Sequence, residues 1–373
     1  MKKLLLSLIV AVTMIALELT SVSANTITYY ANFNPSLDNF ESTPRGSVSL
    51  SNADKLHKTA TITAGNNSGG IAAFEGNYAY QVRTGVVEKV DLSLKMVVWE
   101  TTINNVSFDP ILYYSGRGYV ANNIDNNLYV LDANSGYIIK KIPTDGIMEL
   151  NAANGRILVW MPGDIRLYNT TSFTQVGGDI KLLTYNTIMN KTSLYLLAYN
   201  NIVHIYSTAT GKQQCQFSPK TTVPDTLSLY NNTLIVEADS KVQGYSTTGK
   251  LLWTHTTPYT FTAEVVEKGR LYLMSTSNRL LAINVSNGNS IFDVATTSLG
   301  LDGRNLIASN GILYVYNGLT VRMVNMANGK FLSNKLTVSA KISNDMIIEV
   351  VPLGSNTIAV MNAWTAQITL FSV

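Results

Sequence analysis

The side chains best suited to chemistry are few and far apart in this sequence. Three histidines, His57, His204 and His255, are too widely spaced to form a metal-ligand motif, and we expect structural or surface roles for them. The neighbouring carboxylates Glu264 and Glu267 stand beside a predicted hairpin turn, where we expect them to be exposed. The sequence therefore predicts no catalytic, cofactor-binding or metal-binding residues.

We also expect structural roles for the single cysteine and for one asparagine-rich stretch. Cys215 is the only cysteine, so no intramolecular disulfide can form, and the alternation over residues 213–217 predicts a strand with a buried thiol. The stretch Asn122–Asn127 carries oxygens that could bind calcium, but a turn between two strands explains it better. We expect the turn.

The first 24 residues have the pattern of a secretory signal peptide. Lys2 and Lys3 form a basic start, an apolar run of about 14 residues follows, and Val22-Ser23-Ala24 fits a cleavage site. An uncleaved anchor is the alternative, but the run is short for a bilayer and Glu18 interrupts it. We expect residues 1–24 to be removed and an exported chain without a membrane span, in the periplasm, secreted or at the cell surface. No cysteine at the junction offers a site for a lipid anchor.

The charge of the chain argues against a nucleic-acid partner. The formal net charge is only +3, from 27 basic and 24 acidic residues, and the basic residues are dispersed along the sequence. Nucleic-acid grooves need concentrated positive charge. The many Asn, Ser, Thr and Tyr residues instead indicate a polar surface suited to contacts with proteins or glycans.

A pattern of two short apolar runs joined by a turn recurs along the chain. In each repeat the first run ends at a small polar residue, and these residues are Asp91, Asp132, Asn169, Ser207, Ser246, Asn284 and Asn325. Their separations are 41, 37, 38, 39, 38 and 41 residues. A period this even, without helical patterns, predicts one four-stranded β-propeller blade per repeat.

The interior of each period supports a propeller. Turn-forming pairs such as Asn154-Gly155 and Asn310-Gly311 precede a strand that is apolar on successive residues, as in Leu313–Tyr316. Continuous apolar runs indicate strands covered on both faces, as when blades pack around an axis. A β-sandwich is the alternative, but it does not require a constant period.

The end of the chain predicts how the ring closes. An eighth unit begins near Asp345 and supplies three strands, so the missing outer strand must come from elsewhere. We expect Thr26–Tyr30 to pair with the last strand, with a further strand possible at Thr59–Thr63. The expected organisation is a signal peptide (1–24), an N-terminal segment with the closing strand (25–64), and an all-β, eight-bladed propeller of four-stranded antiparallel blades (65–373).

Several repeats resemble the pyrroloquinoline-quinone (PQQ) type of propeller repeat, in which Asp ends a strand, Gly lies in the turn and Trp closes the next strand. Leu131–Gly136 carries the Asp and the Gly, and Ser246–Trp253 carries the Gly and the Trp. The structural repeat positions that this resemblance marks are Asp91, Trp99, Asp132, Gly136, Gly211, Gly249, Trp253, Gly288 and Gly329.

Two functional classes share this repeat, and the resemblance implies different chemistry for each. Quinoprotein dehydrogenases hold PQQ and calcium at the propeller axis, and many use an adjacent-cysteine disulfide that Cys215 alone cannot form. The chain is more similar to the non-enzymatic, eight-bladed propeller of the outer-membrane barrel-assembly machinery. We expect a monomeric scaffold without a cofactor that binds a protein partner in the cell envelope. A propeller that binds glycan or cell-wall material, or a PQQ-dependent dehydrogenase, is the alternative.

Overall fold

The computed structural model describes most of the chain after its first 47 residues. The described residues are 48–373 except 64–69, 107–108, 222–223, 225, 239, 297–304, 340–346, 354–355, 363–364 and 366. They belong to one compact unit, residues 34–373. Within them lie 31 strands and the short 3-10 helix η1 (Ala53–Lys55). We find no helix in this part of the chain that is long and apolar enough to cross a membrane.

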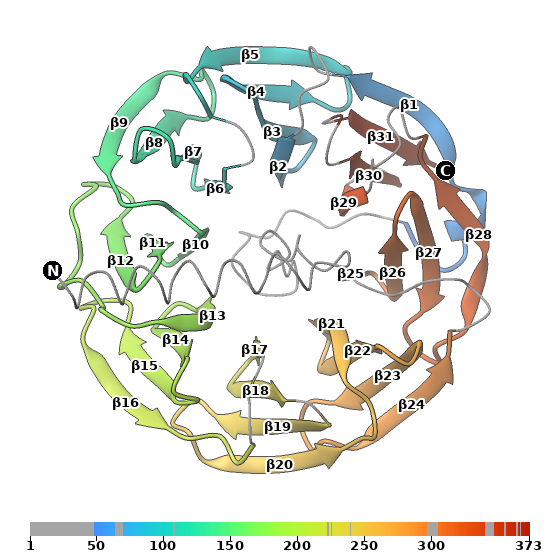
Figure 1. Cartoon of the computed structure of the whole chain (residues 1–373). Helices are drawn as coiled ribbons and strands as arrows, with labels where there is room; N and C mark the ends of the chain where they lie inside the picture. Colours follow the sequence, from blue (N-terminus) through green and yellow to red (C-terminus); the bar gives the residue numbers. More distant parts are fainter. Residues whose placement is uncertain are drawn as a thin grey trace, which may run out of the picture. The chain divides into compact units, whose positions relative to one another are not determined.

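The strands form eight antiparallel sheets arranged as the blades of a ring (Figure 1). We number the blades 1–8 by their innermost strands. These are β2 (Gly70–Glu75), β6 (Ile111–Tyr114), β10 (Glu149–Ala153), β13 (Thr184–Met189), β17 (Thr226–Tyr230), β21 (Phe261–Glu267), β25 (Asn305–Ser309) and β29 (Ile347–Leu353). The second strands are β3 (Tyr78–Arg83), β7 (Arg117–Asn122), β11 (Arg156–Met161), β14 (Ser193–Ala198), β18 (Thr233–Ala238), β22 (Arg270–Ser275), β26 (Ile312–Asn317) and β30 (Thr357–Asn362).

The outer half of each blade repeats in the same order. The third strands are β4 (Val86–Asp91), β8 (Asn127–Asp132), β12 (Asp164–Asn169), β15 (Val203–Ser207), β19 (Lys241–Ser246), β23 (Arg279–Asn284), β27 (Thr320–Asn325) and β31 (Gln367–Ser372). The outermost strands are β5 (Met96–Thr102), β9 (Ile138–Pro143), β16 (Gln213–Phe217), β20 (Leu251–Thr256), β24 (Ser290–Ala295), β28 (Phe331–Thr337) and β1 (His57–Thr63). The predicted eight-bladed, all-β propeller is confirmed.

Blade 3 departs from the four-stranded pattern. Its sheet contains β10, β11 and β12, and an irregular segment takes the place of the outermost strand. Two isolated bridges, Ile165↔Ile180 and Tyr168↔Gln175, hold that segment to β12. The sequence after Asn169 explains the difference, because Gly177-Gly178 replaces the apolar run that follows this position in other repeats.

The cores lie between blades rather than within them. Buried apolar residues of the described chain form a cluster at each of the eight boundaries between neighbouring blades. Because successive side chains of a strand point to opposite faces, Val265 of β21 packs toward blade 7 and Val266 toward blade 5. Leu271 and Tyr272 of β22 divide in the same way. Both faces of an inner strand are covered, which accounts for the continuous apolar runs.

The two ends of the propeller close the ring, as predicted, but with a different strand. β1 pairs with β31, from His57↔Ser372 to Thr63↔Gln367, and supplies the outermost strand of blade 8. The assignment of this place to Thr26–Tyr30 is therefore wrong, and those residues themselves lie outside the described part of the chain. Thr26–Tyr30 has the more β-rich composition, but in Thr59–Thr63 exposed threonines alternate with the half-buried Ala60 and the buried Ile62.

The segment before β1 completes the last blade boundary. Val48, Ala53 and Leu56 are buried in the core between blades 7 and 8. The Asn334 Nδ2 group donates to the carbonyl oxygens of Ala53 (3.1 Å) and Leu56 (2.9 Å). This segment occupies the position that a turn between third and fourth strands fills in the other blades, since blade 8 has no such turn of its own.

Candidate protein-binding surface

The polar repeat positions end the third strands and hold the turns that follow. Asp91 Oδ1 accepts hydrogen bonds from the backbone N–H groups of Ser93 (2.8 Å) and Leu94 (2.9 Å). Asp132 Oδ1 accepts from the N–H groups of Asn134 and Ser135 and from the Ser135 hydroxyl. These hydrogen bonds lower the pKa of Asp132. Asp and Asn at this position thus stabilise the turn by bonding to the backbone two and three residues ahead.

The tryptophan and glycine repeat positions meet across blade boundaries. The Trp99 Nε1–H group donates to the carbonyl of Ala133 (3.1 Å), and a Cβ at Gly136 would lie 2.7 Å from the Trp99 ring. Trp253 repeats both contacts, with Val285 O (2.7 Å) and Gly288. Phenylalanine takes the place of tryptophan opposite two further glycines, in the pairs Phe217–Gly249 and Phe292–Gly329.

The irregular blade 3 has no aromatic residue at this position. Gly211 of blade 4 lies against the backbone of Val176 and Gly177, and a Cβ at Gly211 would come within 2.6 Å of the Val176 carbonyl oxygen. Two glycines therefore allow two backbones to approach where elsewhere a ring packs on a glycine. Asp91 and Asp132 thus end third strands, and the other seven repeat positions lie in the turns that follow third strands or in outermost strands.

The expectation that Glu264 is exposed is wrong. Glu264 faces blade 5 from the innermost strand β21, and its Oε1 accepts a hydrogen bond from the Ser228 hydroxyl at 2.6 Å. Burial raises the pKa of Glu264, while hydrogen bonds from Ser228, Glu237 and Thr226 oppose that rise. Glu237, one of these partners, lies on β18 of the neighbouring blade. Only Glu267 is next to the hairpin turn; Glu264 lies three residues further inside the strand, which explains the error.

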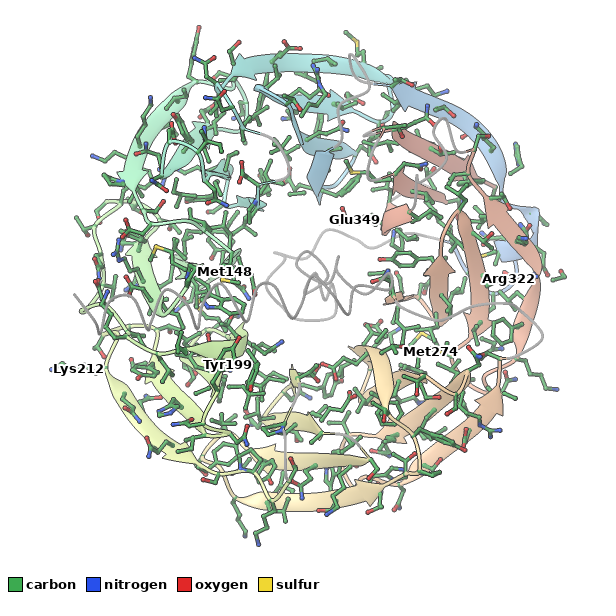
Figure 2. The ribbon with its side chains drawn as sticks, viewed as in Figure 1. Met148, Tyr199, Lys212, Met274, Arg322 and Glu349 are labelled. Carbon is green, nitrogen blue, oxygen red and sulfur yellow. The ribbon has the colours of Figure 1, made fainter. Side chains whose placement is uncertain are left out.

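A second inner-strand carboxyl, that of Glu349, is buried on β29 near the inner edge of the ring (Figure 2). Burial raises the pKa of Glu349 well above 4.5. Because the folded-state pKa exceeds the unfolded one, the stability from this group is fully present below about pH 4.5 and is lost as the pH rises through the folded pKa.

Glu349→Gln is therefore expected to flatten the fall in thermal stability between about pH 5 and pH 8. Each unit of raised pKa corresponds to about 1.4 kcal/mol. Melting curves at several pH values would measure the effect, with the exposed Glu100→Gln as the control. Parallel pH profiles for the Glu349→Gln protein and the unmodified protein would contradict a raised pKa for Glu349.

The remaining chemistry-bearing residues have structural surroundings. His204 is buried on β15, where burial lowers its pKa, and His255 Nδ1 lies 2.9 Å from the Gly288 carbonyl oxygen. Cys215 is half-buried against the core between blades 4 and 5, so the expectation of a fully buried thiol is wrong. Its strand is the outermost of blade 4, which leaves one face toward solvent.

The stretch Asn122–Asn127 forms the turn between β7 and β8, as expected. Asn122 Oδ1 accepts hydrogen bonds from the backbone N–H groups of Ile124 (3.1 Å) and Asp125 (3.3 Å). No three His, Cys, Asp or Glu side chains in the described part of the chain lie close enough to share a metal ion.

Antiparallel order divides the turns between two faces of the ring. Face 1 carries the turns between first and second strands and between third and fourth strands, which bond to each other, as in Ala133 N to Gly116 O (3.1 Å). Face 2 carries the turns between second and third strands and the connections from blade to blade, as in Tyr199 N to Leu183 O (3.0 Å). Large exposed apolar side chains on face 2 mark a candidate binding surface.

Three of these side chains form what we call the tyrosine platform: Leu183, Tyr185 and Tyr199. The Tyr185 and Tyr199 rings stack with centroids 3.9 Å apart and planes 26° from parallel. Tyr199 is 57% exposed and Leu183 61% exposed, although both are large and apolar. Figure 2 shows Tyr199 toward the inner edge of the ring. Exposed, mutually supported tyrosines are typical anchors of protein interfaces.

A network of charges lies beside the platform, in blade 3 and its irregular segment. Arg166 pairs with Asp164 (2.8 Å) and Asp179 (3.3 Å), and Lys181 bonds the same two carboxylates (3.0 and 3.1 Å). Hydrogen bonds from Gln175 and Lys181 lower the pKa of Asp179. These ion pairs hold the segment before Leu183 to β12, and so they help to position the platform.

Comparison with known families agrees with this architecture. The PQQ-repeat family model described as outer membrane protein assembly factor BamB matches residues 182–354, which span blades 4–7 and the first strand of blade 8. Residues 182–354 of this β-propeller are therefore similar to PQQ-like repeats. The resemblance to this type of repeat is confirmed, and the match includes Ser246–Trp253 but not Leu131–Gly136.

Solved structures show how far the propeller fold extends. The crystal structure of BamB from Moraxella catarrhalis is similar with a TM-score of 0.65 and 13% identity, covering 85% of this chain and 100% of that chain. Kluyveromyces lactis Hsv2 gives a TM-score of 0.58 and 10% identity, with coverage of 74% and 100%. None of the curated proteins compared with the chain matches it. At these identities the solved structures support the fold alone.

Sequence reasoning missed the tyrosine platform of this propeller. Tyr185 and Tyr199 are 14 residues apart and only two of 20 tyrosines, so nothing in their types distinguishes them. A usable signal lay nearby, because the third repeat lacks the apolar outer strand and carries Gly177-Gly178 and charged residues instead. A break in an otherwise regular repeat often marks a site where function, rather than the fold, determines the sequence.

Proposed function

We propose that this propeller is an exported, non-enzymatic scaffold that binds a protein partner in the cell envelope through the tyrosine platform. The stacked Tyr185–Tyr199 pair carries the proposal, because it combines a large exposed apolar area with two polar hydroxyl tips. The signal-peptide pattern of residues 1–24 supports export. Similarity to the BamB family model supports an envelope scaffold over a dehydrogenase.

Loss of the platform is expected to weaken partner binding by at least about 30-fold, the effect of removing an interface hot spot. The test is recovery of the tagged chain from its own cell envelope after mild crosslinking, comparing the unmodified protein with Tyr185→Ala/Tyr199→Ala. Ile124→Ala is the matched control, because Ile124 is a 69% exposed apolar residue of face 2 in blade 2.

A protein that is recovered with the unmodified and Ile124→Ala chains, but not with the double tyrosine variant, is the expected result. Equal recovery with all three chains would refute binding through the platform. A glycan array probed with the same three chains tests the glycan alternative. Addition of PQQ and calcium to the purified chain is expected to leave the quinone absorbance unchanged, and a spectral shift would favour the dehydrogenase alternative.

A further inference from the structure

Lysines that are dispersed along the sequence come together on face 1. Seven exposed lysines of the described chain lie in or beside its turns, namely Lys55, Lys95, Lys191, Lys212, Lys250, Lys268 and Lys330. Three of them repeat one position: Lys212, Lys250 and Lys330 each follow the turn glycine between a third and a fourth strand. Figure 2 shows Lys212 extending beyond the edge of the ring.

The acidic residues of face 1 do not neutralise this charge. Asp54 is the exposed carboxylate there among the residues that the structure describes, and Asp91 and Asp132 are half-buried with an oxygen bonded to their own turns. Two further half-buried acids, Glu75 and Glu267, are outnumbered by half-buried arginines, which are Arg117, Arg156 and Arg270. Face 1 is therefore strongly basic.

The ion pairs lie toward the other face. Those formed between described residues involve Arg83, Arg166, Lys181 and Arg279 with their acidic partners, and all four basic residues belong to face 2 or its connections. None of the seven face 1 lysines forms an ion pair with a described residue. Their charge is available to an external anion.

Two strongly exposed apolar side chains lie on the same face as the lysines. Leu94 and Tyr137 lie in the turns between third and fourth strands of the adjacent blades 1 and 2, and they are 68% and 78% exposed. A face that carries both lysines and such residues is typical of proteins that lie on a bilayer, where the charges meet headgroups and the apolar and aromatic groups enter the interface.

We propose that face 1 docks the propeller on a lipid bilayer that contains anionic phospholipids. The lysines come from six different blades, so they match a laterally extended negative surface better than a single phosphate site. Lysine also suits this role, because it is a flexible point charge without the fixed bidentate geometry of arginine. Docking through face 1 leaves the tyrosine platform on face 2 free for the protein partner, and the two proposals can fail separately.

Vesicle sedimentation tests this docking. The chain, as purified from its host, is mixed with vesicles of phosphatidylglycerol and phosphatidylethanolamine, or of phosphatidylcholine alone. Because each lysine near an anionic surface contributes about fivefold, Lys212→Gln/Lys250→Gln/Lys330→Gln is expected to lower the partition coefficient on anionic vesicles by about 100-fold. The matched control removes the same charge toward face 2, as Lys220→Gln/Lys241→Gln/Lys335→Gln, and is expected to change the partition coefficient less than about threefold.

The contribution of the apolar side chains to vesicle binding is tested with a second variant and its control. Leu94→Ser/Tyr137→Ser is expected to weaken binding to anionic vesicles, and Ile124→Ser on face 2 to leave it unchanged. Any leader peptide is common to all variants, so the comparison does not depend on it. Equal effects of the two lysine triples, no preference for anionic vesicles, or equally tight and lysine-dependent binding to double-stranded DNA would overturn the proposal.

Discussion

Trp253→Ala is expected to lower the free energy of unfolding by about 3–5 kcal/mol, as for other large aromatic side chains removed from a core. Trp253 is only 8% exposed and belongs to the core between blades 5 and 6. Its ring covers Gly244 of its own blade and Gly288 of the next, and its Nε1–H group donates to Val285 O at 2.7 Å. Truncation would remove the packing and leave that carbonyl without its donor.

Urea unfolding followed by circular dichroism would measure this loss. The matched control is Leu252→Ala at the preceding position, because Leu252 is 49% exposed on the same strand and its loss is expected to cost no more than about 0.5 kcal/mol. If both variants unfolded at the same urea concentration, Trp253 would not be a joint between blades, and the repeated ring-on-glycine contact would have no energetic role.

The fold was predictable because short sequence patterns that each specify one blade repeat along the chain. The period between the polar positions from Asp91 to Asn325 corresponds to one blade, and each of these residues ends a third strand. The continuous apolar runs were informative for a physical reason: neighbours such as Val265 and Val266 belong to two different cores. A sheet with one wet face could not bury both.

Features that depend on contact between distant segments were harder to predict from the sequence. The choice of His57–Thr63 over Thr26–Tyr30 as the closing strand depends on its fit against β31, which composition does not reveal. The burial of Glu264 depends on Ser228 and Glu237 of the neighbouring blade. The tyrosine platform and the basic face likewise form only when turns distant in sequence are brought to one side of the ring.

The two proposed functions of this propeller, protein binding and membrane docking, belong to opposite faces of the ring. Face 2 carries the tyrosine platform on an ordered charge network, and face 1 carries lysines without ion pairs to described residues, together with Leu94 and Tyr137. A scaffold that rests on a membrane by one face and holds a protein on the other needs rigid blade boundaries, since both surfaces are assembled from turns of different blades. The contacts at those boundaries therefore support both proposed surfaces.

Gly288→Ala is expected to destabilise the propeller by about 2–5 kcal/mol through two separable effects. Gly288 has a φ of +75°, where an alanine costs about 1–2 kcal/mol. A Cβ there would also lie 2.7 Å from the Trp253 ring, and such overpacking costs about 1–3 kcal/mol more. Gly116→Ala isolates the first effect, because Gly116 has the same φ of +75° and a Cβ added there would meet no atom within 4 Å.

The same pair of variants separates backbone strain from the contact with the ring. Urea unfolding should show Gly116→Ala losing only the backbone part, and Gly288→Ala losing both. In a Trp253→Ala background the cost of Gly288→Ala should fall to that of Gly116→Ala, because the clash has been removed and the two positions are coupled. Equal costs for the two glycines in the unmodified protein would mean that the ring moves aside freely, and that the glycine is required only for its backbone conformation.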